Sequence, residues 1–324
     1  MVDTFELSWN LEPRQKEHLV EDLGIALKEF AKVTQGKEPG FTFKAYDIKV
    51  ASVCIIKVVV NVPKVLGRGY IVEEDYETLK SLISSQLQMY FGDQRMFKNH
   101  TLKRFDYRLD CQGISPEHRR VYIKLFDKAK DKYNRMVKQG VLGPHGSVKS
   151  KYSTGNIYGN QSVTVAVYDK ESECLSKQAP VESWEKGVLR FEVRLKANHL
   201  KNKKRVGRED KLKDYWSVER QKEYIRSHLL PIYYRGPYYT HERAKELIYA
   251  SSKSEKKKSV LDEFLRLLGK GSFNTPLKKM SKSTVRSRLK DLEELEINPY
   301  TIPIKDATSF SSLPNIIEQK LKTL

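Results

Sequence analysis

The stretch Gly187–Lys196, GVLRFEVRLK, alternates between apolar and charged side chains. This alternation predicts a β-strand, because successive side chains of a strand point to opposite faces. The apolar face holds Phe191, Val193 and Leu195, and the charged face holds Arg190, Glu192 and Arg194. One carboxylate therefore lies between two guanidinium groups on what we expect to be a rigid strand.

The stretch Leu102–Cys111, LKRFDYRLDC, has the same design. Its apolar side chains are Phe105, Tyr107 and Leu109, and they alternate with Asp106, Arg108 and Asp110. If both strands share one sheet and one core, Asp106, Asp110 and Glu192 converge on the opposite face. A site built from carboxylates favours Mg²⁺ or Mn²⁺, and such an ion polarises a phosphodiester. Nearby arginines would then hold phosphates.

A second interpretation uses the same residues. The carboxylates can form salt bridges across the sheet with Arg108, Arg190 and Arg194, which in the first interpretation bind DNA. The spacing alone does not distinguish these two arrangements. The sequence has no His-x-His, so it lacks the histidine pair that many single-strand nicking enzymes use to bind a metal.

Length and composition narrow the class of protein. The chain has 324 residues, which is enough for two or three domains, and a hydrophobic share of 39% supports a real core. A net charge of +19 points to a polyanion, with nucleic acid before an anionic membrane. No apolar run reaches the roughly 18 residues of a membrane span, and the first residues do not look like a signal peptide. Three scattered cysteines predict core positions in a reducing cytoplasm.

Hydrophobic periodicity predicts an α+β fold with an antiparallel sheet covered by helices on one side. The uncovered face would carry Asp106, Asp110, Glu192 and Lys170. Gly, Ser, Asn and Lys dominate residues 143–160, which we expect to be a loop or a basic flap over DNA. The expected strands are 3–11, 55–60, 102–111, 162–170 and 189–195, and the expected helices are 12–37, 73–91, 116–140 and 208–230.

Beyond residue 196 the chain becomes strongly basic and helical. Residues 196–213 hold eight Lys or Arg against two acids, and Lys203, Lys204 and Arg205 are candidate phosphate contacts. Residues 253–290 hold twelve Lys or Arg against three acidic residues. Their pattern predicts a helix, a break at glycine and a second helix that Ser281 caps. This outline is that of a helix-turn-helix whose DNA contacts would be Lys282, Arg286 and Arg288, although a plain helical hairpin has the same outline.

These shifts in composition divide the chain into four expected parts. They are a catalytic α+β domain over residues 1–200, a helical segment over 201–252, a helix-turn-helix-like domain over 253–303 and a short helical tail over 304–324. The first part would hold the metal, and the third would bind duplex DNA.

A tyrosine hydroxyl can attack a phosphodiester and hold the DNA covalently. On a continuous helix over 208–230, Tyr215 falls on the apolar side and Tyr224 on the polar side with Lys213 and Arg220. Basic neighbours lower the pKa of a phenol, so Tyr224 is the preferred nucleophile. The remaining candidates form one cluster, namely Tyr233, Tyr234, Tyr238 and Tyr239.

Three segments in this order, RFDYRLD (104–110), SVTVAVYDKESE (162–173) and LRFEVRL (189–195), resemble the rolling-circle replication initiators of phages and plasmids. The closer similarity is to the gene II/X replication protein family of filamentous phages, with the plasmid Rep-trans initiators as relatives. Residues 280–303, MSKSTVRSRLKDLEELEINPYTIP, resemble the family's C-terminal helix. Glu296–Pro299 stands where the family has a Gly-Ile-Asp-Ile-like end.

The resemblance implies an enzyme that nicks one DNA strand at an origin with a tyrosine and a divalent metal and later rejoins it. By position, Asp106, Asp110 and Glu192 would bind Mg²⁺ or Mn²⁺, and Lys170 would lie near the scissile phosphate. The partners would be duplex and single-stranded origin DNA, a host helicase and a polymerase. The alternatives are a non-catalytic origin-binding or transcription regulatory protein, and a metal-dependent nuclease that uses water.

Overall fold

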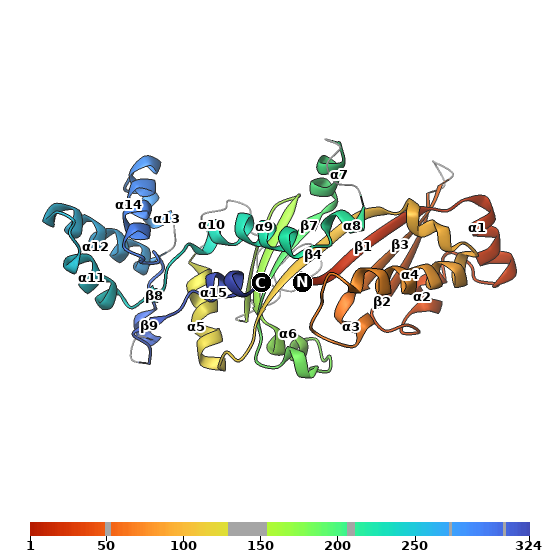
Figure 1. Ribbon diagram of the computed structural model, residues 1–324, viewed down its shortest axis with the longest axis horizontal. Helices are drawn as coiled ribbons and strands as arrows, with labels where there is room; N and C mark the ends of the chain where they lie inside the picture. The colour runs from red at the N-terminus through yellow and green to blue at the C-terminus, as the bar shows by residue number, and fades with distance from the viewer. Residues whose placement is uncertain (49–52, 129–153, 206–210, 272–273, 307–308) are drawn as a thin grey trace. The chain divides into compact units, whose positions relative to one another are not determined.

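The computed structural model describes residues 1–48, 53–128, 154–205, 211–271, 274–306 and 309–324. It confirms the α+β class (Figure 1). A seven-stranded sheet has the order β2-β3-β1-β4-β7-β6-β5, and the paired strands β1–β3, β1–β4, β2–β3 and β5–β6 are antiparallel.

The chain folds into two compact units that interleave along the sequence. The first comprises residues 1–108, 161–163 and 193–223, and the second comprises 109–160, 164–192 and 224–324. The boundary passes through the strands β4 (Thr101–Cys111) and β7 (Leu189–Lys196). This division differs from the consecutive parts expected from composition, because a sheet draws together strands that are distant in sequence.

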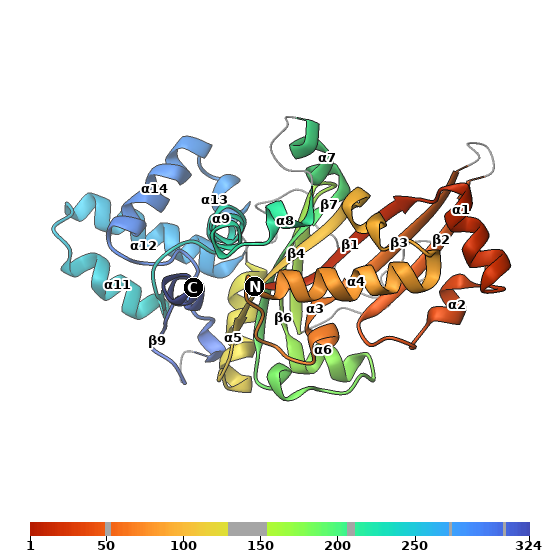
Figure 2. The same ribbon diagram turned by 45° about the vertical axis from the view of Figure 1, so that its right-hand side comes forward.

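The first unit is built on the hairpin of β2 (Phe41–Ile48) and β3 (Val53–Asn61) beside β1 (Val2–Asn10). Helix α4 (Asp75–Phe91) ends at Gly92, whose left-handed conformation has φ 67°. Tyr90 of this helix, Phe43 of β2 and Phe30 of α2 (Phe30–Thr34) pack edge to face at centroid distances of 5.3–5.5 Å. This aromatic cluster forms the core between α4 and the sheet. Figure 2 shows α4 and α2 beside the strands β2 and β3.

The helix expected over residues 12–37 is wrong. The segment consists of α1 (Pro13–Glu17), a π-helical turn (His18–Asp22) and α2. Gly24 has φ 64° between them. Apolar residues at helical spacing predicted one helix, but a glycine in the left-handed region ends the first part before the second begins.

In the second unit, β5 (Gly155–Gly159) pairs with β6 (Val163–Asp169), so part of the expected loop over 143–160 is a strand. The rest of that loop, residues 143–153, lies outside the described residues. Helix α5 (Pro116–Asp127) packs on the apolar face of β7 through Phe126 and Phe191, whose ring centroids are 5.4 Å apart. The helix expected to reach residue 140 is described as far as Asp127.

The single helix expected over residues 208–230 is also wrong. The chain forms α8 (Leu212–Tyr215), α9 (Val218–His228) and α10 (Leu230–Tyr233). Trp216 leaves the helical conformation, and its indole N–H donates to the carbonyl groups of Val72 and Glu73 at 3.3 and 3.1 Å. Pro231 lies in the first turn of α10 rather than ending a helix, which is a position that proline tolerates.

The C-terminal region of the second unit is mainly helical. Helix α12 (Glu255–Lys270) packs on α11 (His241–Ala250), on α14 (Lys282–Glu294) and on the short α13 (Asn274–Leu277). Ser281 caps α14 by accepting from the backbone N–H of Thr284, as the sequence predicted. The two-residue strands β8 (Tyr238–Tyr239) and β9 (Ser312–Leu313) pair beside these helices, and α15 (Ile316–Thr323) forms the tail.

The remaining elements are α3 (Val62–Leu66), α6 (Lys170–Ser176), α7 (Ala197–Arg205) and the 3₁₀ turns Gln94–Asn99, Ser183–Glu185 and Ile304–Asp306. In the part of the chain that the structure describes, no helix is long and apolar enough to cross a membrane. Cys54, Cys111 and Cys174 are buried free thiols, which confirms their expected core positions. Burial raises the pKa of the Cys111 thiol to about 12.

Candidate active site

The charged face of β7 in the second unit brings together a phenol and a carboxylate. Tyr168 of β6 donates a hydrogen bond from its hydroxyl to Oε1 of Glu192. Glu192 is 4% exposed, whereas Tyr168 is partly exposed to solvent. A carboxylate in hydrogen-bond contact with a phenol is placed to accept its proton.

Arg190 lies two residues before Glu192 and therefore on the same face of β7. Its Nε and Nη2 donate to the two carboxylate oxygens of Asp110 at 2.7 and 2.9 Å. This bidentate geometry is the strong form of an arginine–carboxylate pair. The face thus carries a Tyr168–Glu192 pair beside an Arg190–Asp110 pair.

The two residues after Tyr168 have structural partners. Asp169 caps α6 by accepting from the backbone N–H of Ser172 at 3.1 Å, and its other oxygen accepts from Arg119 at 2.7 Å. Lys170 forms ion pairs with Glu173 at 2.8 Å and Glu185 at 3.3 Å. Burial and the nearby charge of Arg190 lower the pKa of the Lys170 amine, but Glu173 and Glu185 outweigh them and raise it above its ordinary value. Lys170 is therefore a fixed cation whose charge is largely compensated within the fold.

Asp106 belongs to the first unit and is fully buried. Nε of Arg104 donates to both of its carboxylate oxygens at 2.9 Å, and Nε of Arg194 donates at 3.1 Å. Burial raises the pKa of Asp106, while the two guanidinium groups act in the opposite direction. One arginine of the same strand and one of β7 therefore hold this carboxylate.

Arg108 has a different partner from the one expected. Its Nη1 lies 3.6 Å from a carboxylate oxygen of Asp3 in β1, and its Nη2 donates to the carbonyl of Gly69. The side chain is 3% exposed. The expectation that Arg108 contacts DNA is wrong, because its guanidinium group is buried against β1 and the segment before α4.

The carboxylates as placed do not fit a Mg²⁺ or Mn²⁺ site of the expected kind. Asp106 and Asp110 each have a guanidinium bound across their oxygens, and Glu192 accepts from Tyr168. Among the described residues, no group of three or more His, Cys, Asp and Glu side chains is arranged to hold a metal ion. The geometry is that of the second interpretation, in which the carboxylates form salt bridges. Arg190 binds Asp110 and Arg194 binds Asp106. Asp106 and Glu192 are buried, contrary to the expected uncovered face, whereas Asp110 and Lys170 are partly exposed.

Tyr224 does not lie on a polar face. It is 4% exposed, and its ring stacks on His228 with the centroids 6.0 Å apart. The prediction assumed one continuous helix over 208–230, but the break at Trp216 separates α8 from α9. The assumed helix therefore placed Tyr224 on the wrong face. Gln221, Tyr224 and Ile225 form the buried side of α9 at helical spacing. Tyr215 is buried, as the sequence predicted.

The candidate DNA contacts of the C-terminal half are mostly on helix surfaces. Lys282 and Arg286 of α14 are exposed, while Arg288 is partly buried and lies 3.9 Å from Asp291. Lys203 lies in α7 and is partly buried. Lys204 and Arg205 end the same helix, and their side chains lie outside the described residues.

The sequence interpretation did not select Tyr168 as a candidate nucleophile. Its signal was available, because Tyr168 directly precedes Asp169 and Lys170 at the end of a predicted strand. A polar tyrosine at that strand end shares a face with Lys170 by alternation, but its partner depends on the pairing of β6 with β7. That pairing is a property of the folded sheet.

No protein-family model matches the sequence, and a search of curated proteins returned no similar sequence.

Proposed function

We propose that this protein nicks and rejoins one DNA strand at a replication origin through Tyr168, and so initiates rolling-circle replication. The observation that carries the proposal is the hydrogen bond from the Tyr168 hydroxyl to Glu192. The net charge of +19 and the resemblance of the three strand motifs to rolling-circle initiators support it. A host helicase and polymerase would act on the opened strand.

In the proposed reaction the Tyr168 oxygen attacks the scissile phosphorus and Glu192 accepts the phenolic proton. A bond forms between the tyrosine oxygen and phosphorus, and the bond from phosphorus to the 3′-oxygen breaks. The 3′-oxygen takes up a proton from water and leaves as a free hydroxyl that a polymerase can extend, and Glu192 returns its proton to water. Attack by a 3′-hydroxyl on the phosphotyrosine reverses these steps and rejoins the strand. The proton acceptor in this reaction is Glu192 and not a metal-bound group, because the carboxylates as placed do not fit a metal.

A gel assay of covalent adducts tests this proposal. The protein is incubated with labelled single-stranded origin DNA from its own replicon, with Mg²⁺ or Mn²⁺ and separately with chelator, and run under denaturing conditions. We expect an adduct with the wild type and with Tyr224→Phe, and none with Tyr168→Phe. Adduct formation by Tyr168→Phe at the wild-type level would exclude Tyr168 as the nucleophile. Loss of the adduct in chelator would contradict a reaction without a metal and would favour the metal role of the carboxylates.

The second candidate is an origin-binding protein that does not cut DNA. The pairing of Asp106 and Asp110 with arginines favours it, because these carboxylates are accounted for by ion pairs. The same gel separates the two functions: binding to origin DNA with neither cleavage nor adduct supports the second. Cleavage without an adduct would indicate a nuclease that uses water.

A further inference from the structure

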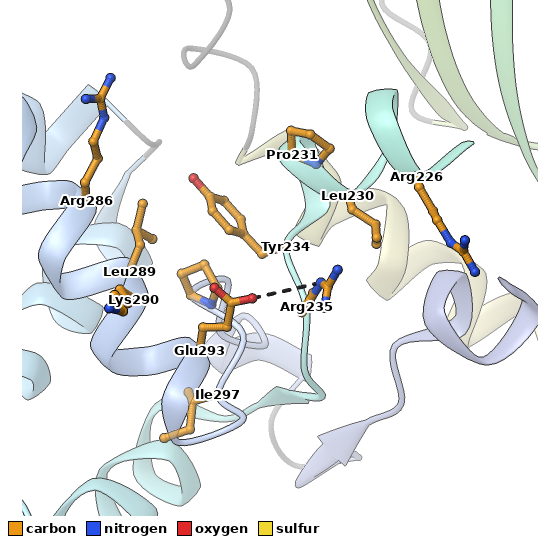
Figure 3. Close-up of a pocket in the computed structure, with 11 residues that line it drawn as sticks. Arg226, Leu230, Pro231, Tyr234, Arg235, Arg286, Leu289, Lys290, Glu293 and Ile297 are labelled. Atoms are coloured by element: carbon orange, nitrogen blue, oxygen red, sulfur yellow. Dashed lines mark ion pairs between the residues drawn. The ribbon is translucent and has the colours of Figure 1, made fainter. Parts of the chain in front are cut away.

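A cavity of about 440 Å³ lies between the end of α9 with α10 on one side and α14 on the other, within the second unit (Figure 3). Its volume is in the range of sites that bind small organic groups. Helix α14 contributes Arg286, Leu289, Lys290 and Glu293, which share one face of the helix. The cavity thus uses the face of α14 that carries Arg286, one of the expected DNA contacts.

The charge around the cavity suits a phosphate. Arg226, Arg235, Arg286 and Lys290 line it, against one carboxylate, Glu293. Glu293 lies 3.9 Å from Nε of Arg235. Within the described part of the chain, Arg226, Arg286 and Lys290 have no acidic partner at ion-pairing distance. These three side chains can therefore bind the phosphates of a ligand without first losing an ion pair within the protein.

Tyr234 projects from the segment after α10 toward α14 in Figure 3 and lines the same cavity. Its backbone has φ 58° and ψ 176°, a conformation that side-chain-bearing residues rarely adopt. Such strain persists where surrounding contacts enforce it, and it concentrates at ligand-binding sites.

Two buried asparagines enforce this backbone. Asn315 donates from Nδ2 to the carbonyl of Tyr234 at 2.9 Å. Asn298 donates from Nδ2 to the carbonyl groups of Tyr233 and Arg235 at 2.9 and 3.1 Å. The chain on both sides of Tyr234 is thus fixed, and the ring is held at the cavity instead of turning away from it.

We propose that this cavity binds a short stretch of single-stranded DNA, with a base stacked on Tyr234 and successive phosphates on Arg226, Arg286 and Lys290. Figure 3 shows Arg226 and Arg286 on opposite sides of Tyr234. This proposal rests on the proposed function, because the single strand that the cavity would bind is the one opened at the origin. Base stacking on an aromatic ring combined with a basic groove is the usual chemistry of single-strand binding. A duplex would need the same face of α14 to enter the major groove, and α10 stands opposite that face.

Fluorescence anisotropy of the full-length protein with a labelled oligodeoxythymidylate of about 12 nucleotides tests the site. Tyr234→Leu is expected to weaken binding about 5- to 100-fold, and Tyr234→Phe to retain it because the ring remains. Tyr249→Leu, an exposed tyrosine on α11 beside Lys245, is the matched control. Unchanged affinity of Tyr234→Leu would overturn the assignment.

A charge variant provides a second, independent measurement on a surface position. Arg286→Gln is expected to reduce the slope of log affinity against log salt by about 0.7, as for one lost contact to a single strand. Arg266→Gln, an exposed arginine on α12 paired with Glu263, should leave that slope unchanged. Equal slopes for the wild type and Arg286→Gln would contradict the phosphate role.

The adduct assay run in parallel separates this site from the proposed function. An adduct in the wild type together with unchanged oligonucleotide affinity in Tyr234→Leu would reject the cavity alone. Weakened affinity in Tyr234→Leu without any wild-type adduct would reject the nicking reaction alone. A duplex that binds as tightly as the single strand, and is weakened equally by Tyr234→Leu, would contradict the choice of single-stranded DNA.

Discussion

The hydroxyl of Tyr168 in β6 donates a hydrogen bond to the carboxylate of Glu192 in β7. Both side chains belong to the second unit. On the same face of β7 as Glu192, Arg190 binds Asp110 of the neighbouring strand β4. The contact gives a partly exposed phenol an acceptor for its proton. It also gives Glu192 a hydrogen-bond partner that does not depend on a metal.

Glu192→Gln tests the role of this carboxylate. The amide keeps the size of the side chain and can still accept a hydrogen bond, but it is not a useful base. We expect the rate of adduct formation to fall about 10²- to 10⁴-fold, which is the usual contribution of a general base. Glu246→Gln, an exposed carboxylate on α11, is the control. An unchanged rate in Glu192→Gln would remove Glu192 from the mechanism.

Asp106→Asn tests whether Asp106 is an ion-pair residue. Loss of the charge leaves Arg104 and Arg194 without their buried partner, although both arginines are partly exposed and can be hydrated. We expect the free energy of unfolding in urea to fall by about 1–3 kcal/mol. Asp22→Asn, which removes an exposed partner of His18, should change it by less than about 0.5 kcal/mol. An Asp106→Asn protein with wild-type stability but no cleavage activity would instead favour the metal role.

Lys128 makes stability depend on pH. Burial lowers the pKa of its amine from 10.5 to about 8, while the amine donates to the carbonyl of Thr301 at 2.7 Å. Between these two pH values the unfolded chain binds more protons than the folded one, so raising the pH favours folding. We expect the free energy of unfolding of the wild type, relative to Lys128→Met, to rise from about pH 8 toward pH 10.5. Parallel pH curves for the two proteins would contradict this.

Glu296 occupies a position that suits glycine. It follows α14 with φ 55°, and the N–H of Ile297 donates to the carbonyl of Leu292 at 2.9 Å, as in a Schellman ending. Glu296→Gly removes the strain, and we expect about 0.5–1 kcal/mol of added stability in thermal unfolding. Ser287→Gly, at an exposed position inside α14, should lose about the same amount of stability in thermal unfolding. Destabilisation by Glu296→Gly would contradict the strained ending.

Local pattern predicted the strands well. Alternation at 102–111 and 189–195 identified β4 and β7 because a strand has a fixed period of two residues. It also placed Phe191 on the covered face, where Phe126 of α5 packs. The burial of Arg190 and Glu192 on the other face was not predictable, because it depends on partners from neighbouring strands.

Helix phase was predictable only where a helix is unbroken. Helix α4 follows its predicted periodicity, whereas Trp216 divides the expected helix over 208–230 by bonding to the chain before α4. That contact joins residues more than a hundred positions apart, so no local window contains it. The break also changes the helix phase that had placed Tyr224 on a polar face, and Tyr224 is buried. Tyr168 contacts Glu192 because β6 lies beside β7 in the sheet.

The most direct test of the proposed function is to locate the DNA on the protein. The covalent adduct formed with single-stranded origin DNA is digested with nuclease and trypsin, and the modified peptide is sequenced by mass spectrometry. We predict a nucleotide phosphate on Tyr168. A modified peptide that carries the nucleotide on Tyr224, Tyr234 or any other residue, or the absence of an adduct with DNA from the protein's own replicon, would contradict it.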